Sequence, residues 1–222
     1  FGRDLGLVQL HVHRAAETQI QPRRTHRRAG AALRLAAEVL GLAAGDPALA
    51  AAARDIGADG PMCLFPRTAW AEGRGERLTP EPRLPELSVV LVNPGVPSPT
   101  GPVYRAYDQA PLGAVRRPAP PADWTPRATA AWLEEQRNDL EAPALALAPD
   151  IGLALDAVRA TQGVLLTRMS GSGATVFGLY ADAAAARAAA DGLASAHAGW
   201  WVRAGRLGGA QDHGKVSGDN RT

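Results

Sequence analysis

The sequence predicts an α+β fold in which helices cover one face of a mostly antiparallel sheet. Short apolar runs typical of strands alternate with segments that have the apolar spacing of helices, most clearly after residue 85. The chain has 222 residues, of which 46% are hydrophobic, so it is long enough to bury a core. We therefore expect a globular protein with one large domain or two small ones.

Composition excludes several classes of protein. No apolar run is long enough to span a membrane, so we expect no membrane partner. The formal net charge of +2 is too small to indicate nucleic acid binding by itself. Cys63 is the only cysteine and cannot form an internal disulfide, which fits a reducing compartment and a cytoplasmic location.

The first half of the chain contains helices before strands. Residues 29–41 have helical apolar spacing and end at a glycine. Asp46 and Pro47 suit the N-cap and first position of a second helix that runs to Ala53. Short apolar pieces at 61–72 suggest strands, and the proline-rich residues 80–85 suggest a connector between domains.

The second half contains most of the predicted sheet. The first strand, 88–92, ends at a turn signal, Asn93-Pro94-Gly95, and a long surface loop is expected at 111–126. The remaining expected elements are helices at 127–136, 143–148, 150–160 and 182–194, and strands at 163–169, 174–180 and 200–203.

Residues 167–176 read TRMSGSGATV and place a glycine-rich turn between two of these strands. Glycine permits positive φ angles and lets another group approach the backbone closely. The turn therefore either joins two strands or forms part of a binding site, and the turn alone does not distinguish these interpretations.

Several segments together resemble one family. LVNPGVPSPTGPVY (91–104), RNDLEAPA (137–144) and RMSGSGATVFGLYAD (168–182) are similar, in order and spacing, to segments of the 4-diphosphocytidyl-2-C-methyl-D-erythritol kinases. GADGPMCL (57–64) and GRGERLTP (73–80) extend the similarity. These kinases belong to the GHMP superfamily, and the resemblance covers roughly residues 29–205.

The resemblance implies the fold and the activity. It implies a GHMP-type α+β kinase that uses ATP and Mg²⁺ to phosphorylate the 2-hydroxyl of the diphosphocytidyl substrate, in the non-mevalonate route to isoprenoid precursors. It also implies that the turn formed by Ser170, Gly171, Ser172 and Gly173 lies beside the main phosphate loop and shapes the nucleotide site. Backbone N–H groups in such a concave turn favour an anionic phosphate.

The resemblance also implies roles for three further residues. Asp59 matches a catalytic aspartate that accepts or orients the proton of the attacking hydroxyl, although Gly60 departs from the family's pattern and is expected to hold it less firmly. Thr100 and Tyr104 match a threonine and an aromatic residue on one helix face. The Tyr104 ring either flanks the cytosine or packs in the core, and both alternatives stay open. We expect Asn138 and Asp139 to cap a helix.

Two family elements are not found in this sequence: an early lysine-bearing strand and the main glycine-rich phosphate loop. IQPRRTHRRAG (20–30) stands where the loop is expected. His26-Arg27-Arg28, read one base later, can encode Ile-Gly-Gly, so we interpret residues 1–28 as an aberrant or out-of-frame segment. We expect residues 29–80 to be a remnant of the N-terminal domain, 84–207 to form the C-terminal domain, and 208–222 to be a disordered tail.

Without these two elements we expect weak ATP binding and little or no phosphate transfer. Two other functions remain possible from the sequence. One is a non-catalytic remnant of such a kinase. The other is a nucleic-acid-binding module that uses Arg23, Arg24, Arg27 and Arg28. The sequence does not identify metal ligands or an oligomeric state.

Overall fold

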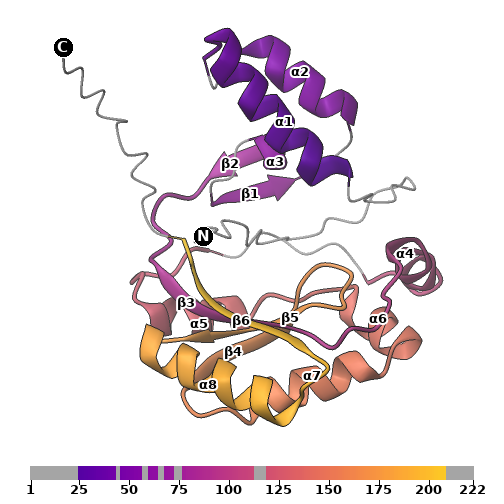
Figure 1. Ribbon diagram of the computed structural model, residues 1–222, viewed down its shortest axis with the longest axis vertical. Coiled ribbons are helices and arrows are strands. Elements are labelled where there is room, and N and C mark those ends of the chain that lie inside the picture. The colour runs from indigo at the N-terminus through magenta and orange to yellow at the C-terminus, as the bar shows by residue number, and fades with distance from the viewer. Residues whose placement is uncertain are drawn as a thin grey trace.

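The computed structural model describes residues 25–43, 46–56, 60–64, 68–72, 77–112 and 119–208. Figure 1 shows an upper part, with helices α1, α2 and α3 and strands β1 and β2, and a lower part built on a larger sheet. The predicted α+β class is confirmed: the described residues form eight helices and two antiparallel sheets.

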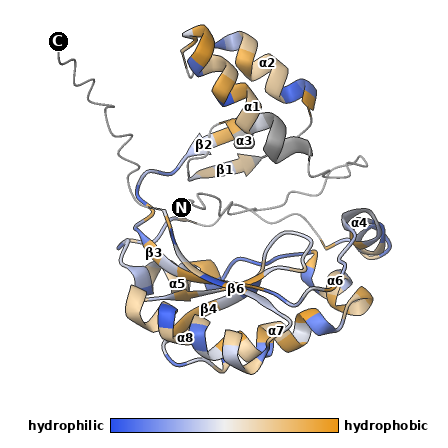
Figure 2. Cartoon of the chain, viewed as in Figure 1, coloured by the Kyte–Doolittle hydropathy of each residue, from blue (hydrophilic) through white to orange (hydrophobic). Residues whose placement is uncertain are grey.

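The upper part packs three helices around a small core. Helices α1 (Thr25–Leu40) and α2 (Pro47–Ile56) both contact the short α3 (Gly60–Leu64). Their shared core contains Ala37, Leu49, Ala53 and Leu64. Helix α1 also carries three large exposed apolar side chains, Leu35, Val39 and Leu40, and Figure 2 shows the apolar residues of this helix.

Two sequence predictions for the upper part need correction. The helix expected at 29–41 is present as α1, but it begins four residues earlier, at Thr25. Residues 60–64 form helix α3, whereas strands were expected from residue 61, and only β1 (Ala69–Glu72) follows that expectation. A short apolar run does not reveal whether it is helix or strand, because its periodicity cannot be measured over so few residues.

The lower part contains a four-stranded antiparallel sheet in the order β4-β5-β3-β6. Strand β3 (Leu87–Asn93) lies inside the sheet and pairs with both β5 (Val176–Tyr180) and β6 (Trp201–Leu207). Strand β4 (Val164–Met169) pairs with β5, so the two strands form a hairpin. Residues alternate between the two faces of β3, which places Val90 and Val92 in one core cluster and Leu87 and Val89 in another.

Helices cover both faces of this sheet, not one face as the sequence predicted. Helices α7 (Asp150–Arg159) and α8 (Ala183–Ala196) pack on the face that carries Val90 and Val92. Helix α5 (Pro126–Glu134) packs on the opposite face and contributes Ala130, Trp132 and Leu133 to the second core cluster. The remaining two helices are α4 (Thr100–Asp108) and α6 (Glu141–Leu147).

The N-cap predicted at Asp46 is confirmed, and Asp182 caps the helix that was expected to begin with it. The carboxylate of Asp46 accepts a hydrogen bond from the Ala48 N–H at 2.8 Å, as expected for the start of α2. Asp182 accepts from the N–H groups of Ala184 and Ala185 at 2.9 and 2.8 Å, so it is the N-cap of α8 and not its first residue.

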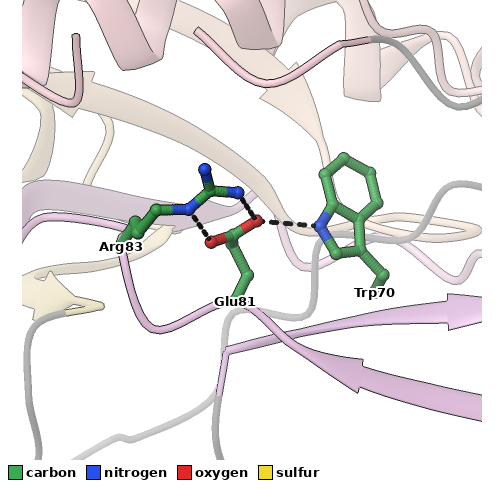
Figure 3. A network of polar contacts seen from close by, with 3 residues as sticks. All are labelled: Trp70, Glu81 and Arg83. Atoms are coloured by element: carbon green, nitrogen blue, oxygen red, sulfur yellow. Dashed lines mark hydrogen bonds and ion pairs between the residues drawn. The ribbon is translucent and has the colours of Figure 1, made fainter. Parts of the chain in front are cut away.

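A buried polar contact lies where strands β1 and β2 pack against the lower part (Figure 3). Strand β1 supplies Trp70, which is buried in the same cluster as Trp132 of α5, with the two rings edge to face and 5.3 Å between centroids. Glu81 follows β2 (Arg77–Pro80) and binds Arg83 through two hydrogen bonds of 2.7 and 2.8 Å. The indole N–H of Trp70 donates to the same carboxylate at 3.3 Å.

This contact bears on the expected connector at 80–85. Glu81 is 5% exposed, and Leu84 belongs to the core cluster that contains Trp70, so these connector residues are packed. The domain boundaries at 28, 80, 84 and 208 stay predictions.

Candidate active site

Three segments that are far apart in the sequence meet at the turn between β4 and β5. We call this turn, residues 170–173, the glycine loop. Within it the Gly173 N–H donates to the Ser170 carbonyl at 3.0 Å, and at its base the Ser170 N–H donates to the Thr175 carbonyl at 2.8 Å. The other two segments are 93–100, before and at the start of α4, and 138–141, before and at the start of α6.

Both glycines of the glycine loop have positive φ angles, +55° for Gly171 and +84° for Gly173. L-residues rarely adopt this region, which explains the alternating glycines of the sequence. Gly173 is also confined by its neighbours. A Cβ atom there would lie 2.9 Å from the Met169 sulfur and 3.1 Å from both Ile151 Cδ1 and Ser98 Oγ.

One side of the glycine loop is held by Asn138. Its side-chain N–H₂ donates to the carbonyl oxygens of Met169 and Gly171, at 3.1 and 2.8 Å. Its side-chain oxygen accepts from the Leu140 N–H at 3.1 Å. The predicted capping role of Asn138 and Asp139 is wrong, because the N-cap of α6 is Leu140 and no side chain caps it. Asn138 instead forms a turn before the helix and joins the RNDLE segment to the glycine loop.

The opposite side of the glycine loop is held by the segment before α4. The Ser98 hydroxyl donates to the Ser172 carbonyl at 2.5 Å. The hydroxyl groups of Thr100 and Ser172 lie 3.0 Å apart and share a hydrogen bond. Thr100, expected on the substrate side, therefore contacts a residue that was expected on the nucleotide side.

The turn after β3 has a similar arrangement. The side-chain oxygen of Asn93 accepts a hydrogen bond from the Gly95 N–H at 2.9 Å. The side-chain N–H₂ group of Asn93 donates to the Thr175 hydroxyl at 3.0 Å. Gly95 has a φ of +81°, which suits glycine. The turn predicted from Asn93-Pro94-Gly95 is present, and Asn93 links it to the end of the glycine loop.

Charged side chains support the base of the glycine loop. Arg168 donates to the carbonyl oxygens of Leu133 and Glu134 at the C-terminal end of α5, at 2.8 and 3.3 Å. Burial lowers the pKa of Arg168, while the nearby charges of Glu134 and Glu141 oppose that shift. Glu141 also accepts a hydrogen bond from the Met169 N–H at 3.2 Å.

Asp139 lies next to Asn138 but does not bind the glycine loop. Its carboxylate pairs with Arg137 at 2.6 Å, and its side chain is 8% exposed. The ion pair keeps the negative charge of Asp139 compensated close to the loop.

The carbonyl oxygens of Ser170, Gly171 and Ser172 therefore accept hydrogen bonds, but two of the N–H donors of the glycine loop are not used within the described residues. Within the described part of the chain, the backbone N–H groups of Gly171 and Ser172 make no hydrogen bond. Both residues are only half-buried, so a ligand can reach them. Adjacent N–H groups in a turn of this kind favour an anion such as a phosphate oxygen.

Tyr104 lies one turn after Thr100 on α4 and is half-buried. It packs against the larger core cluster, next to buried Val103 and Tyr107. Part of the Tyr104 side chain therefore stays exposed while the rest packs in the core.

Asp59 lies outside the described residues. Its neighbour Gly60 is buried, and a Cβ there would collide with the Ala53 carbonyl oxygen of α2. The close approach of α2 and α3 therefore requires a residue without a side chain at this position. The expectation that Gly60 holds Asp59 less firmly stays a prediction.

Sequence reasoning missed Ser98 and Asn93 as members of the site and assigned Asn138 only a cap. The available signal was the order of small and amide residues in segments 93–100 and 138–141. Such residues hydrogen bond to backbone groups, but the pattern does not name the partner. Among the described residues, no group of three or more His, Cys, Asp or Glu side chains could hold a metal ion.

Comparison with known proteins gives a match that includes segment 138–141 and the glycine loop. Residues 128–199 match the family of GHMP kinases, C terminal. A 4-diphosphocytidyl-2-C-methyl-D-erythritol kinase of Caulobacter vibrioides (strain NA1000 / CB15N) is 53% identical over 182 residues, which is 81% of this chain and 63% of that protein. The chain is therefore similar to the 4-diphosphocytidyl-2-C-methyl-D-erythritol kinases and, in residues 128–199, to the C-terminal part of the GHMP kinases.

Two further kinases of this kind show a similar extent of similarity. The kinase of Rhodopseudomonas palustris (strain ATCC BAA-98 / CGA009) is 50% identical over 192 residues, 81% of this chain and 62% of its own length. A crystal structure of 4-(cytidine 5'-diphospho)-2C-methyl-D-erythritol kinase superposes with a TM-score of 0.61 at 37% identity, over 79% of this chain and 62% of that one. The chain thus spans a little under two thirds of the length of these relatives.

Among the helices of the described ranges, none is long and apolar enough to cross a membrane.

Proposed function

We propose that the chain carries the glycine loop and the substrate-facing segment of a kinase that transfers the γ-phosphoryl group of ATP to the 2-hydroxyl of 4-diphosphocytidyl-2-C-methyl-D-erythritol. This reaction belongs to the non-mevalonate route to isoprenoid precursors, and we expect it in the cytoplasm. The observation that carries the proposal is the unpaired N–H groups of Gly171 and Ser172, held beside Thr100 by hydrogen bonds.

The residues of the chain have distinct tasks in this proposal. Gly171 and Ser172 donate backbone hydrogen bonds to phosphate oxygens, which offsets negative charge without any movement of the loop. Thr100 and Tyr104 hold the cytidine side of the substrate. Asp59 accepts the proton of the 2-hydroxyl of the substrate. The hydroxyl oxygen bonds to the γ-phosphorus while the bond between the γ-phosphorus and the β-phosphate oxygen breaks, which releases ADP.

ATP fits the glycine loop, because phosphate oxygens are the acceptors that two adjacent N–H groups require. Magnesium has no such support in the described residues, which offer no cluster of carboxylates. In this proposal Mg²⁺ is bound by the ATP phosphates, as is usual for kinases.

Phosphoryl transfer depends mainly on positioning, and the sequence at 20–30 has arginines where a glycine-rich phosphate loop is expected. We therefore expect weak binding of ATP and slow or undetectable transfer. The second candidate is a non-catalytic remnant that folds only in its C-terminal half, binds nucleotide weakly or not at all and transfers no phosphate.

Two measurements test the proposal. Titration with ADP or ATP should shift the amide NMR signals of Gly171 and Ser172, and an unchanged spectrum at roughly 10 mM nucleotide, ten times the upper end of common KM values, would contradict it. Incubation with Mg-ATP and the diphosphocytidyl substrate, followed by ADP release, separates the enzyme from the remnant. Asp59→Asn should reduce any turnover by orders of magnitude with little change in Tm.

A further inference from the structure

We propose that Asn138 is a positioning residue that sets the direction of the Ser172 N–H, and so prepares the glycine loop for an anion. The inference deepens the proposed function, and its phosphate ligand rests on that function. The loop geometry that Asn138 controls can be measured without any ligand.

The orientation of the Asn138 amide follows from its partners. The carbonyl oxygens of Met169 and Gly171 can only accept, so the atom that faces both of them is the N–H₂ group. The Leu140 N–H can only donate, so the atom that faces it is the side-chain oxygen. All three contacts agree with one orientation of the amide, and the flipped orientation would break all three.

The contact with Gly171 fixes a peptide plane. The Gly171 carbonyl and the Ser172 N–H belong to the same planar trans peptide and point in opposite directions. Because Asn138 binds that carbonyl at 2.8 Å, the Ser172 N–H points away from Asn138. The next plane is fixed in the same way, since Ser98 binds the Ser172 carbonyl at 2.5 Å and the Gly173 N–H bonds back to Ser170.

The composition of the glycine loop makes such a restraint necessary. Gly171 has a φ of +55° with open space where a Cβ would stand, so nothing in its own packing opposes rotation of the following peptide. A glycine crosses between positive and negative φ at little cost. We infer that the loop keeps one form because side chains of other segments bind its carbonyl groups.

An Asx turn before α6, in which the Asn138 side-chain oxygen accepts from the Leu140 N–H, is the competing explanation for Asn138, and one substitution separates the two. Asn138→Asp retains an oxygen that can accept from the Leu140 N–H, and aspartate also forms such turns. The same substitution replaces both donors with an oxygen that repels the carbonyls of Met169 and Gly171. A pure turn role is therefore unaffected by it, whereas the restraint on the glycine loop is lost.

The experiment compares wild type, Asn138→Asp and Asn138→Ser by amide NMR and hydrogen exchange. Asn138→Ser replaces the two N–H donors with one hydroxyl on a shorter side chain and adds no charge. We expect the Ser172 signal to move in both variants. Exchange at the Gly173 amide should rise roughly ten- to thirtyfold, the ratio that corresponds to two net hydrogen bonds. Loop signals and exchange equal to wild type in both variants would overturn the inference.

A pH series adds a readout that a purely structural role would not give. Protonation of the new carboxyl in Asn138→Asp restores one O–H donor, so its loop signals should return toward those of wild type as the pH falls through about 4. Asn138→Ser should show no such return, and an identical pH response of both variants would count against the inference. The comparison of the variants is made without ligand and tests only the role of Asn138. A wild-type loop that does not respond to added nucleotide would contradict the proposed function and leave the role of Asn138 intact.

Discussion

The hydroxyl groups of Thr100 and Ser172 lie 3.0 Å apart, although 72 residues separate them in the sequence. Thr100 begins α4 and Ser172 lies in the glycine loop, so this hydrogen bond joins the segment expected to face the substrate to the loop expected to face the nucleotide. A change at either residue should therefore be felt by the other.

This relationship predicts a positive coupling energy in a double-mutant cycle. Thr100→Val and Ser172→Ala each remove one hydroxyl, and each should lower the free energy of unfolding by about 0.5–1.5 kcal/mol. The double variant should lose less than the sum of the two, by roughly 0.5 kcal/mol or more. Urea denaturation measures all four proteins. Strict additivity would show that the two hydroxyl groups do not interact in solution.

The two glycines of the glycine loop should differ in their tolerance of a methyl group. Gly173→Ala combines a φ of +84° with contacts of 2.9–3.1 Å to Met169, Ile151 and Ser98, so we expect a loss of about 2–4 kcal/mol. Gly171→Ala is the matched control, since it has only the cost of positive φ, roughly 1–2 kcal/mol. Chemical denaturation gives both values, and equal losses would mean that the crowding around Gly173 relaxes.

How much of this structure the sequence predicted can be judged element by element. The α+β class, strand β3, the β4–β5 hairpin and the N-cap at Asp46 follow from periodicity and turn residues, which are local signals. The end of β6 was placed at Arg203, but the strand continues to Leu207 because it pairs with the whole of β3. The local sequence of β6 does not indicate which distant strand it pairs with, or how far the pairing extends.

The candidate site divides in the same way. Two glycines alternating with serines indicate a special backbone at residues 170–173, and the positive φ angles of Gly171 and Gly173 confirm it. The bonds from Asn138 and Ser98 to that loop were not predictable, because they depend on how α4 and α6 pack against the hairpin. Helix propensity and turn signals contain no information about such contacts.

The role of the Tyr104 ring can be decided by one substitution. Tyr104→Leu keeps an apolar side chain against the core but removes the flat ring. If the ring stacks on cytosine, the Kd for cytidine 5'-diphosphate should rise about 5- to 150-fold, the range for loss of one base–aromatic stack, with little change in Tm. Tyr104→Phe is the control and should bind as wild type does. A lower Tm with unchanged Kd would assign the ring to the core.

The contact between Glu81 and Arg83 predicts a pH dependence of stability (Figure 3). Hydrogen bonds from Arg83, and more weakly from Trp70, lower the pKa of Glu81 below its ordinary value of 4.5, although burial opposes this. A carboxyl with a lowered folded pKa binds protons more weakly in the folded state than in the unfolded state. Its contribution to stability is therefore fully present above the unfolded pKa and is lost as the pH falls through the folded pKa.

The matched variants for this test are Glu81→Gln and Glu86→Gln. Glu81→Gln removes the charge from a carboxylate that is 6% exposed, and we expect a loss of about 1 kcal/mol at pH 7, a modest value because the Arg83 side chain is 52% exposed and screened by water. Glu86 also pairs with an arginine, Arg206 at 2.9 Å, but both side chains are more than half exposed, so Glu86→Gln should change stability by less than about 0.5 kcal/mol.

The pH dependence of Tm between pH 7 and 3 separates these cases. Wild type and Glu86→Gln should lose stability steeply below about pH 5, because protonation of Glu81 removes the ionised acceptor of Arg83 and Trp70. Glu81→Gln lacks the titrating group, so its curve should fall less and approach that of wild type at the acidic end. Parallel curves for wild type and Glu81→Gln over the whole range would mean that Glu81 has the same pKa in the folded and unfolded states. The contact of Glu81 with Arg83 and Trp70 would then not depend on the charge of Glu81.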